Sequence, residues 1–380
     1  MKRVCLWGTS LKKIADEAQL LAVIKIIHER VPGAHVSLFS TGQLRMDALS
    51  QRYGFRTRTM RTARLWNVIP ALAASDLFVM VGGPFFEEIK QTIVCLGLFV
   101  TAKLLRVPVV TYGVTAFPFQ TWWGRSIYRW IFNRMDAISV RDQVVVPILR
   151  ELGVKKKIDV CADPRYVLDC APQTDVIAIL EQEGIRVDEP FVVVTTRLLH
   201  HDVPEWVKRS HGYTKERVVR TNEALAHAIG AISEVAQVVI LPMHPTYEED
   251  LAVANAIRRS LKDPSRLRIL SRRYDAVEVM GLIERSEFLL ACRLGSAVFA
   301  SAMGTPIVGV AYDPRLLDHM KQIGFPQDVL DWKDIHSGNL TNKIREIWNG
   351  RSTYRARMNA QRETFRAMAY TDADLITKFL

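Results

Sequence analysis

Short apolar segments alternate with helical segments along almost the whole chain, and this alternation limits the fold more than any other feature of the sequence. The apolar segments predict strands at residues 4–7, 35–40, 77–81, 108–112, 137–140 and 158–160, and again at 191–195, 237–242, 268–270, 288–291 and 307–310. Helical patterns lie between them, at residues 15–31, 92–105, 221–234 and 247–261. Such alternation is typical of an open parallel sheet with helices on its faces.

The length of 380 residues exceeds one ordinary core and suits two domains of this kind. We therefore expect an α/β fold of two Rossmann-like, doubly wound parallel-sheet domains that face a cleft. Pro172 and the polar stretch 182–190 bracket the expected hinge, so the first domain takes residues 1–172 and the second takes residues 173–341. The arginine-rich tail, residues 342–380, is expected to be helical and could cross back to the first domain.

The formal net charge of +11 is confined to the first half of the chain. Residues 1–170 hold 24 Lys and Arg against 13 Asp and Glu, whereas residues 171–380 hold 27 of each. This asymmetry favours an anionic partner for the first domain, such as a phosphorylated lipid carrier or an anionic membrane surface. No recognisable nucleic-acid module accompanies it, so we expect no nucleic-acid partner. A basic surface that serves only solubility is the alternative.

Residues 119–132 interleave Trp, Phe and Tyr with arginine, which is the composition of an amphipathic helix at a membrane interface. A helix buried between the domains would have a similar composition. The sequence thus leaves open peripheral binding to the inner face of the cytoplasmic membrane.

The sequence argues against several other classes of protein. Its most apolar segment, residues 92–105, is too short to cross a membrane and contains Lys103, and the first residues lack the pattern of a signal peptide. We therefore expect a cytoplasmic protein. The five cysteines form no Cys-x-x-Cys pair, and the Asp372-Ala373-Asp374 triplet is more typical of a helix cap than of a metal site, so we expect no metal and no cofactor.

The segment Cys292-Arg293-Leu294-Gly295-Ser296 lies between a predicted strand and a predicted helix. Backbone N–H groups and the helix dipole favour an anion at such a junction, and the guanidinium of Arg293 adds a positive charge. We therefore expect Arg293, Leu294, Gly295 and Ser296 to bind an anionic small ligand. A simple ion pair between Arg293 and a neighbouring carboxylate is the alternative.

A set of short motifs, in order along the chain, resembles the polysaccharide pyruvyl transferases. They are Gly8 with Asp-Glu-Ala-Gln-Leu at 16–20, Val-Gly-Gly-Pro at 81–84, Val-Val-Thr-Tyr-Gly at 109–113, Ile-Ser-Val-Arg-Asp at 138–142, Ala-Asp-Pro at 162–164, Val-Thr-Thr-Arg at 194–197, Leu-Pro-Met-His at 241–244, and Arg293-Leu294 through Tyr312. The resemblance covers most of the chain. It departs from the family at Ala15, in the loop after residue 113, and at Gly295, where the family has other residues.

The resemblance implies a fold similar to glycosyltransferase-B (GT-B) enzymes and transfer of pyruvate from phosphoenolpyruvate to a hydroxyl pair of a glycan or lipid-linked saccharide. The second domain would bind the donor, whose carboxylate and phosphate suit the guanidinium groups of Arg197 and Arg293. The first domain would bind the acceptor, through Asp16, Glu17, Gly83 and Arg141. For Asp16 and Glu17 a role in starting a helix is the alternative, and for Arg141 an internal ion pair.

Gly295 occupies the position at which the family has the histidine that transfers protons, and glycine cannot do so. Three explanations remain open. The histidine's role could have moved to His244, which follows a predicted strand, or to His200, His201 or His211. The chain could instead be a glycosyltransferase that uses a nucleotide sugar, with Gly295 admitting a phosphate to the helix N-terminus. It could also be a catalytically impaired homologue that only binds.

Overall fold

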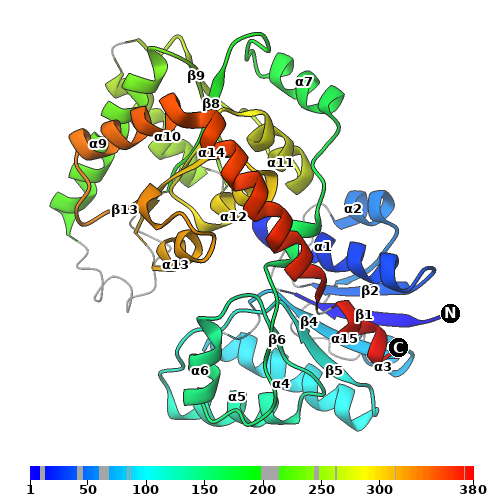
Figure 1. Cartoon of the computed structure of the whole chain (residues 1–380). Helices are drawn as coiled ribbons and strands as arrows, with labels where there is room; N and C mark the ends of the chain where they lie inside the picture. Colours follow the sequence, from blue (N-terminus) through cyan, green and yellow to red (C-terminus); the bar gives the residue numbers. More distant parts are fainter. Residues whose placement is uncertain are drawn as a thin grey trace. The chain divides into compact units, whose positions relative to one another are not determined.

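The computed structural model describes residues 1–8, 13–40, 46–59, 68–83, 85, 87–197, 214–243, 248–261, 263–312, 314–371 and 373–380. The chain divides into two compact units (Figure 1). The first comprises Met1–Leu168 together with Phe365–Leu380, and the second comprises Asp169–Thr364. The chain passes from the first unit to the second between Leu168 and Asp169.

The first unit is built on a five-stranded parallel sheet with the order β3-β2-β1-β4-β5. Its strands are β1 (Arg3–Trp7), β2 (His35–Ser40), β3 (Arg56–Thr59), β4 (Leu77–Val81) and β5 (Val109–Tyr112), and a separate pair is formed by β6 (Ser139–Val140) and β7 (Asp159–Val160). All residues of β4 and β5 are buried, as expected for strands covered on both faces.

Helices cover both faces of this sheet, with α1 and α2 on one side and α4 and α5 on the other (Figure 1). The helices are α1 (Ile14–Arg30), α2 (Met46–Tyr53), α3 (Ile69–Ala73), α4 (Ile89–Leu104), α5 (Trp122–Arg134), α6 (Val145–Glu151), the short 3₁₀ helix η2 (Pro164–Val167) and α15 (Ala373–Lys378). Helix α1 packs against η2 and α15. The end of the chain belongs to this unit, since Tyr112 Oη donates a 2.7 Å hydrogen bond to the carbonyl of Ala369.

The second unit contains a six-stranded parallel sheet with the order β10-β9-β8-β11-β12-β13. Its strands are β8 (Phe191–Thr195), β9 (Gln237–Ile240), β10 (Leu267–Ile269), β11 (Leu289–Ala291), β12 (Ile307–Ala311) and β13 (Val329–Asp331). In both sheets the order reverses beside the first strand of the unit, between β1 and β4 and between β8 and β11. Ligands of open α/β sheets bind beyond the carboxyl ends of strands at such a switch point.

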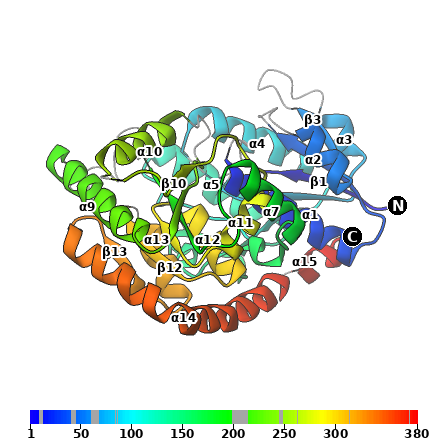
Figure 2. The same cartoon turned by 90° about the horizontal axis from the view of Figure 1, so that it is seen from above.

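In the second unit α11 packs against both α7 and α12, α12 also packs against α13, and α9 lies beside α10 (Figure 2). The helices of this unit are α7 (Gln173–Gln182), α9 (Lys215–Ser233), α10 (Glu248–Ser260), α11 (Ala276–Arg285), α12 (Leu294–Met303), α13 (Pro314–Gln322), the 3₁₀ helix η3 (Pro326–Asp328) and α14 (Ser337–Thr371), which continues into the first unit. Helix α12 ends at Gly304, whose φ of 72° lies in the left-handed region that favours glycine. A Cβ at this position would also overlap the side chain of Asn359.

The predicted fold class is confirmed, because both units are doubly wound parallel sheets and each predicted strand is present. Strands β3 and β13 were not predicted. Both lie at sheet edges; β3 reads Arg-Thr-Arg-Thr, and β13 has three residues, so neither shows the apolar run of a buried strand. No helix in the described part of the chain has the length and apolar character needed to cross a membrane.

Candidate functional site

The residues predicted to bind the donor lie together at the switch point of the second sheet. Thr196 and Arg197 directly follow β8, and Cys292 and Arg293 directly follow β11. Since β8 and β11 are neighbours and run parallel, their carboxyl ends lie side by side. The N-terminus of α12 begins at the same place, with Arg293 as its N-cap residue. The sheet order therefore brings two guanidinium groups and a helix N-terminus to one position.

Arg293 is tied to its surroundings by two internal contacts. Its Nε donates a 2.9 Å hydrogen bond to the carbonyl of Thr196, and its Nη2 pairs with the carboxylate of Asp250 on α10. The Asp250 side chain is fully buried and also accepts a 2.8 Å hydrogen bond from the backbone N–H of Met243. Arg293 thus makes the internal ion pair that the sequence left open, and Asp250 offsets its positive charge.

Arg197 differs from Arg293 in having no carboxylate partner among the described residues. Its Nη1 donates a 2.6 Å hydrogen bond to Tyr312 Oη, and its guanidinium carbon lies 4.5 Å from the centre of the Tyr312 ring. Within the described ranges, Arg197 Nε and Thr196 Oγ1 are both buried and have no hydrogen-bond partner. Buried polar atoms are rarely left unpaired in folded proteins, so these two atoms are available to donate hydrogen bonds to a polar or anionic ligand.

The start of α12 presents backbone donors and a locked serine. Ala297 N donates the first helical hydrogen bond, to the carbonyl of Arg293, so the N–H groups of Leu294, Gly295 and Ser296 precede the helical hydrogen-bond ladder. The Ser296 hydroxyl is buried and shares a 2.8 Å hydrogen bond with Thr195 Oγ1 while donating to the carbonyl of Arg293. Ser296 therefore fixes α12 against β8, whereas Gly295 is half-buried and leaves its backbone open to approach.

Cys292 lies among these charged groups but is not a nucleophile at neutral pH. Burial raises the pKa of its thiol to about 12, and the positive charges of Arg293 and Arg197 offset only part of that effect. The thiol is therefore protonated and packs as an apolar group.

The predicted catalytic residue His244 lies outside the described residues, as do the alternatives His200, His201 and His211. Its role remains a prediction. Within the part of the chain that the structure covers, no cluster of His, Cys, Asp and Glu side chains is arranged to hold a metal ion.

The residues predicted on the acceptor side all belong to the first unit. Gly83 follows β4 at the switch point of the sheet, and Asp16 and Glu17 lie in the first turn of α1, where Glu17 is buried. Arg141 follows β6 and forms ion pairs of 3.4 Å with Asp142 and with Asp163.

Asp163 is the centre of a buried ion cluster that the sequence did not reveal. Its two carboxylate oxygens accept hydrogen bonds of 2.8 and 2.7 Å from Arg165. Burial alone would raise the pKa of Asp163, but Arg165 and Arg141 hold it well below its usual range. Burial lowers the pKa of Arg165, but the negative charge of Asp163 and, to a smaller extent, that of Asp16 raise it. Arg141 thus forms the internal ion pairs that were its alternative role.

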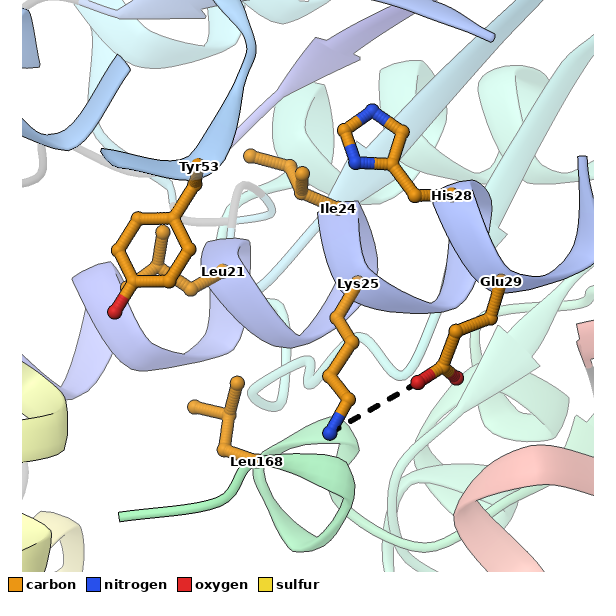
Figure 3. A pocket seen from close by; sticks show the side chains of 7 residues that line it. All are labelled: Leu21, Ile24, Lys25, His28, Glu29, Tyr53 and Leu168. Atoms are coloured by element: carbon orange, nitrogen blue, oxygen red, sulfur yellow. Dashed lines mark ion pairs between the residues drawn. The ribbon is translucent and has the colours of Figure 1, made fainter. Parts of the chain in front are cut away.

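A separate cavity of about 320 Å³ lies on the outer side of α1 (Figure 3). Lys25 crosses its edge, donating a 2.9 Å hydrogen bond to the carbonyl of Val167 and lying 3.9 Å from Glu29. Burial lowers the pKa of His28, which favours the neutral form of this imidazole. The lining residues are Leu21, Ile24, Lys25, His28, Glu29, Tyr53 and Leu168. None of the residues predicted to form a site is among them.

Comparison with known proteins identifies relatives of this chain. The polysaccharide pyruvyl transferase family matches it over residues 16–314. The amylovoran biosynthesis protein AmsJ of Erwinia amylovora is 23% identical over 282 residues, which are 72% of this chain and 65% of AmsJ. The match therefore spans just under two thirds of the length of AmsJ.

Solved glycosyltransferase structures share the fold. Anabaena HepE in complex with UDP-glucose has a TM-score of 0.64 at 13% identity, with 100% of this chain and 99% of HepE covered. A glycosyltransferase from Rickettsia africae has a TM-score of 0.65 at 11% identity (100% and 98% covered), and the Escherichia coli ADP-heptose heptosyltransferase II has 0.56 at 12% (93% and 100% covered). At such identities the likeness shows the fold, which is GT-B-like as predicted.

Proposed function

This chain belongs to the polysaccharide pyruvyl transferase family, and from that premise we propose that it transfers a pyruvyl group from phosphoenolpyruvate to a hydroxyl pair of a glycan or lipid-linked saccharide. The family match and the likeness to AmsJ support a transferase that acts in polysaccharide biosynthesis. We assign donor binding to the second unit and acceptor binding to the first, and place the reaction in the cytoplasm.

One observation carries the proposal for the donor. Arg197 Nε and Thr196 Oγ1 are buried without partners among the described residues, beside the N-terminus of α12. An anion that accepts hydrogen bonds from both atoms and from the backbone at Gly295 would satisfy them. Phosphoenolpyruvate carries two anionic groups, so one can meet Arg197 while the other lies at the helix N-terminus.

Arg293 has a different role in this proposal. Its charge is compensated by Asp250, so it contributes less net attraction for an anion than Arg197 does. Its contacts with Thr196 and Asp250 instead hold the ends of β8, β11 and α10 in a fixed arrangement. We therefore place Arg197 in direct contact with the donor and give Arg293 a mainly positioning role at its edge.

The reaction needs proton transfer as well as binding. Forming a ketal requires that an acid protonate the vinyl carbon of phosphoenolpyruvate, that two hydroxyl oxygens bond to the adjacent carbon, and that phosphate leave as the hydroxyl protons pass to a base. The protonated Cys292 thiol cannot accept them at neutral pH. We propose His244, which follows β9 in the segment Leu241-Pro242-Met243-His244, for this role.

Phosphate release and thermal melting together test the proposal. Incubation of the purified protein with phosphoenolpyruvate and candidate saccharides should release phosphate, and phosphoenolpyruvate alone should raise the melting temperature. Absence of phosphate release, with a rise in melting temperature produced only by nucleotide sugars, would contradict it.

Gly295 favours a second candidate, transfer of a sugar from a nucleotide-sugar donor. Gly295 takes the position of the family's proton-transferring histidine and leaves the start of α12 accessible to a diphosphate. The likeness to HepE, solved with UDP-glucose, fits this candidate. A protein that phosphoenolpyruvate stabilises without any product would instead be a catalytically impaired binding homologue.

A further inference from the structure

Helix α4 has an apolar outer face as well as an apolar inner face. The inner face is buried against the sheet through Val94, Cys95, Leu98, Phe99 and Ala102. On the opposite side Ile89, Ile93 and Leu104 are 64%, 61% and 79% exposed, and the half-buried Leu96 and Val100 lie between them. The spacing of these five residues places them along one stripe of the helix. A helix that covers a sheet normally has polar residues on this side.

Helix α5 extends the exposed apolar surface. Trp122 and Trp130 are 80% and 38% exposed, and α5 lies beside α4 on the same face of the sheet (Figure 1). The starts of the two helices are joined by Glu87, which accepts hydrogen bonds of 2.6 and 2.8 Å from the backbone N–H groups of Gln120 and Thr121. Trp122 therefore lies close to the beginning of α4. Toward the other end, the Trp130 ring contacts Phe99 edge to face at 5.6 Å.

Exposed basic residues lie on and next to the same two helices as this surface, which we call the α4–α5 patch and define by Ile89, Ile93, Leu104, Trp122 and Trp130. Residues 87–136 contain six Lys and Arg against three Asp and Glu. Two of the three acidic groups are already engaged, Glu87 with Thr121 and Asp136 with Lys103 at 2.6 Å. The exposed basic residues are Lys90, Arg106, Arg125, Arg129 and Arg134, and of these Arg125 lies 3.6 Å from Glu151, a carboxylate outside this segment. The patch thus combines protruding apolar side chains with a positive rim.

We propose that the α4–α5 patch docks on an anionic lipid bilayer. Tryptophan is enriched where water meets lipid, because its ring is apolar and its N–H is polar. Ile89, Ile93 and Trp122 enter the acyl boundary, and the surrounding arginine and lysine side chains meet the lipid phosphates. The charge excess favours this surface over a neutral protein partner. The proposal goes beyond the transfer reaction and does not depend on which donor the protein uses.

Vesicle sedimentation tests the docking proposal in the absence of donor and acceptor. The full chain is mixed with vesicles of equal parts phosphatidylglycerol and phosphatidylcholine, or of phosphatidylcholine alone, at low and high salt. The wild-type protein should sediment with the anionic vesicles at low salt and be released by high salt, because salt screens the lipid charge. The Ile93→Glu, Trp122→Glu double variant should bind at least about tenfold more weakly, since two large apolar side chains no longer enter the bilayer.

The control variant is Val235→Glu, which introduces a carboxylate at a 48% exposed valine of the second unit. It should sediment like the wild-type protein, and equal melting temperatures should show that all variants are folded. Failure of the wild-type protein to sediment with anionic vesicles, or equal binding by the double variant, would overturn the proposal. A dimer in light scattering that the double variant abolishes, without vesicle binding, would assign the patch to a second copy of the chain instead. Because phosphate release is measured separately with a soluble acceptor, neither result depends on the other.

Discussion

Replacing Arg197 with methionine tests whether the end of β8 holds the donor. Methionine keeps much of the volume of the side chain and removes its charge and its hydrogen-bond donors. Among the described residues the hydrogen bonds of Arg197 use only Nη1, which donates to Tyr312. Nε is buried and has no hydrogen-bond partner among the described residues. Together with Nη2, on the same side of the guanidinium, it forms a fork of two donors that suits one anionic group.

The expected loss follows from the number of hydrogen bonds. At the low end of the range for charged groups, each bond contributes about 1.5 kcal/mol, so two bonds contribute ~3 kcal/mol. Because about 1.4 kcal/mol changes a dissociation constant tenfold, Arg197→Met should weaken phosphoenolpyruvate binding about 100-fold. The free energy of unfolding should fall by no more than about 1–2 kcal/mol, because the lost hydrogen bond to Tyr312 is partly offset by removal of a buried Nε that has no partner among the described residues.

Isothermal titration calorimetry with phosphoenolpyruvate measures this loss directly. The matched control is Arg268→Met, on β10, which removes an arginine whose Nε donates to the backbone carbonyl of Gly184. The control should bind phosphoenolpyruvate as the wild-type protein does. If Arg197→Met also binds it with unchanged affinity, Arg197 does not contact the donor and the reasoning from its unpaired Nε is wrong.

Arg293→Met leaves the buried Asp250 carboxylate without its ion-pair partner and should lower the free energy of unfolding by about 3–5 kcal/mol, measured by urea titration. Adding Asp250→Asn to this variant should recover part of the loss. An unchanged free energy of unfolding in the single variant would contradict the ion pair. His244→Gln should lower kcat by about 10² to 10⁴ without changing the dissociation constant of phosphoenolpyruvate, and unchanged turnover would move proton transfer to another residue. Asp163→Asn should lower the melting temperature at neutral pH, because Arg165 loses its bidentate partner. Burial would raise the pKa of Asp163, but the opposing effect of Arg165 is larger, so the folded-state pKa lies below the unfolded-state value of about 4. The ionised Asp163 therefore stabilises the fold fully above about pH 4, and this contribution is lost as the pH falls toward the folded-state pKa. The melting temperatures of the wild-type protein and the variant should converge in acid.

The two parallel sheets were predictable because buried strands appear in the sequence as short continuous apolar runs. β8 reads Phe-Val-Val-Val-Thr and β12 reads Ile-Val-Gly-Val-Ala, and both are fully buried. The edge strand β3 has no apolar residue, so its pairing with β2 depends on the completed sheet rather than on its own sequence. Local patterns therefore identify the centre of each sheet but not its edges.

The position of the candidate site was also predictable, but its internal pairing was not. Arg197 and Arg293 could be placed because each follows a strand of the same parallel sheet. The partner of Arg293 is 43 residues away, on a helix whose burial against the site depends on tertiary packing. The Tyr312 contact of Arg197 spans 115 residues for the same reason. The sequence shows that both arginines are present near the site, but only the folded structure shows that the charge of Arg293 is balanced by a carboxylate.

The outer face of α4 shows a further limit of sequence patterns. Residues 92–105 predicted a helix, and their apolar pattern did not indicate which of its faces would be exposed. The structure begins the helix at Ile89 and exposes Ile89, Ile93 and Leu104. An apolar helix can be buried on all sides or exposed on one, and only the packing of its neighbours distinguishes the two.

A crystal structure with bound phosphoenolpyruvate would show directly whether the ends of β8 and β11 hold the donor. One anionic group of phosphoenolpyruvate should lie within hydrogen-bond distance of Arg197 Nε and Thr196 Oγ1, with the second at the backbone N–H groups that begin α12. The same structure would show which ionisable side chain can reach the vinyl carbon. Phosphoenolpyruvate bound elsewhere, or a nucleotide sugar at this position and no binding of phosphoenolpyruvate, would contradict the assignment of this site to the donor.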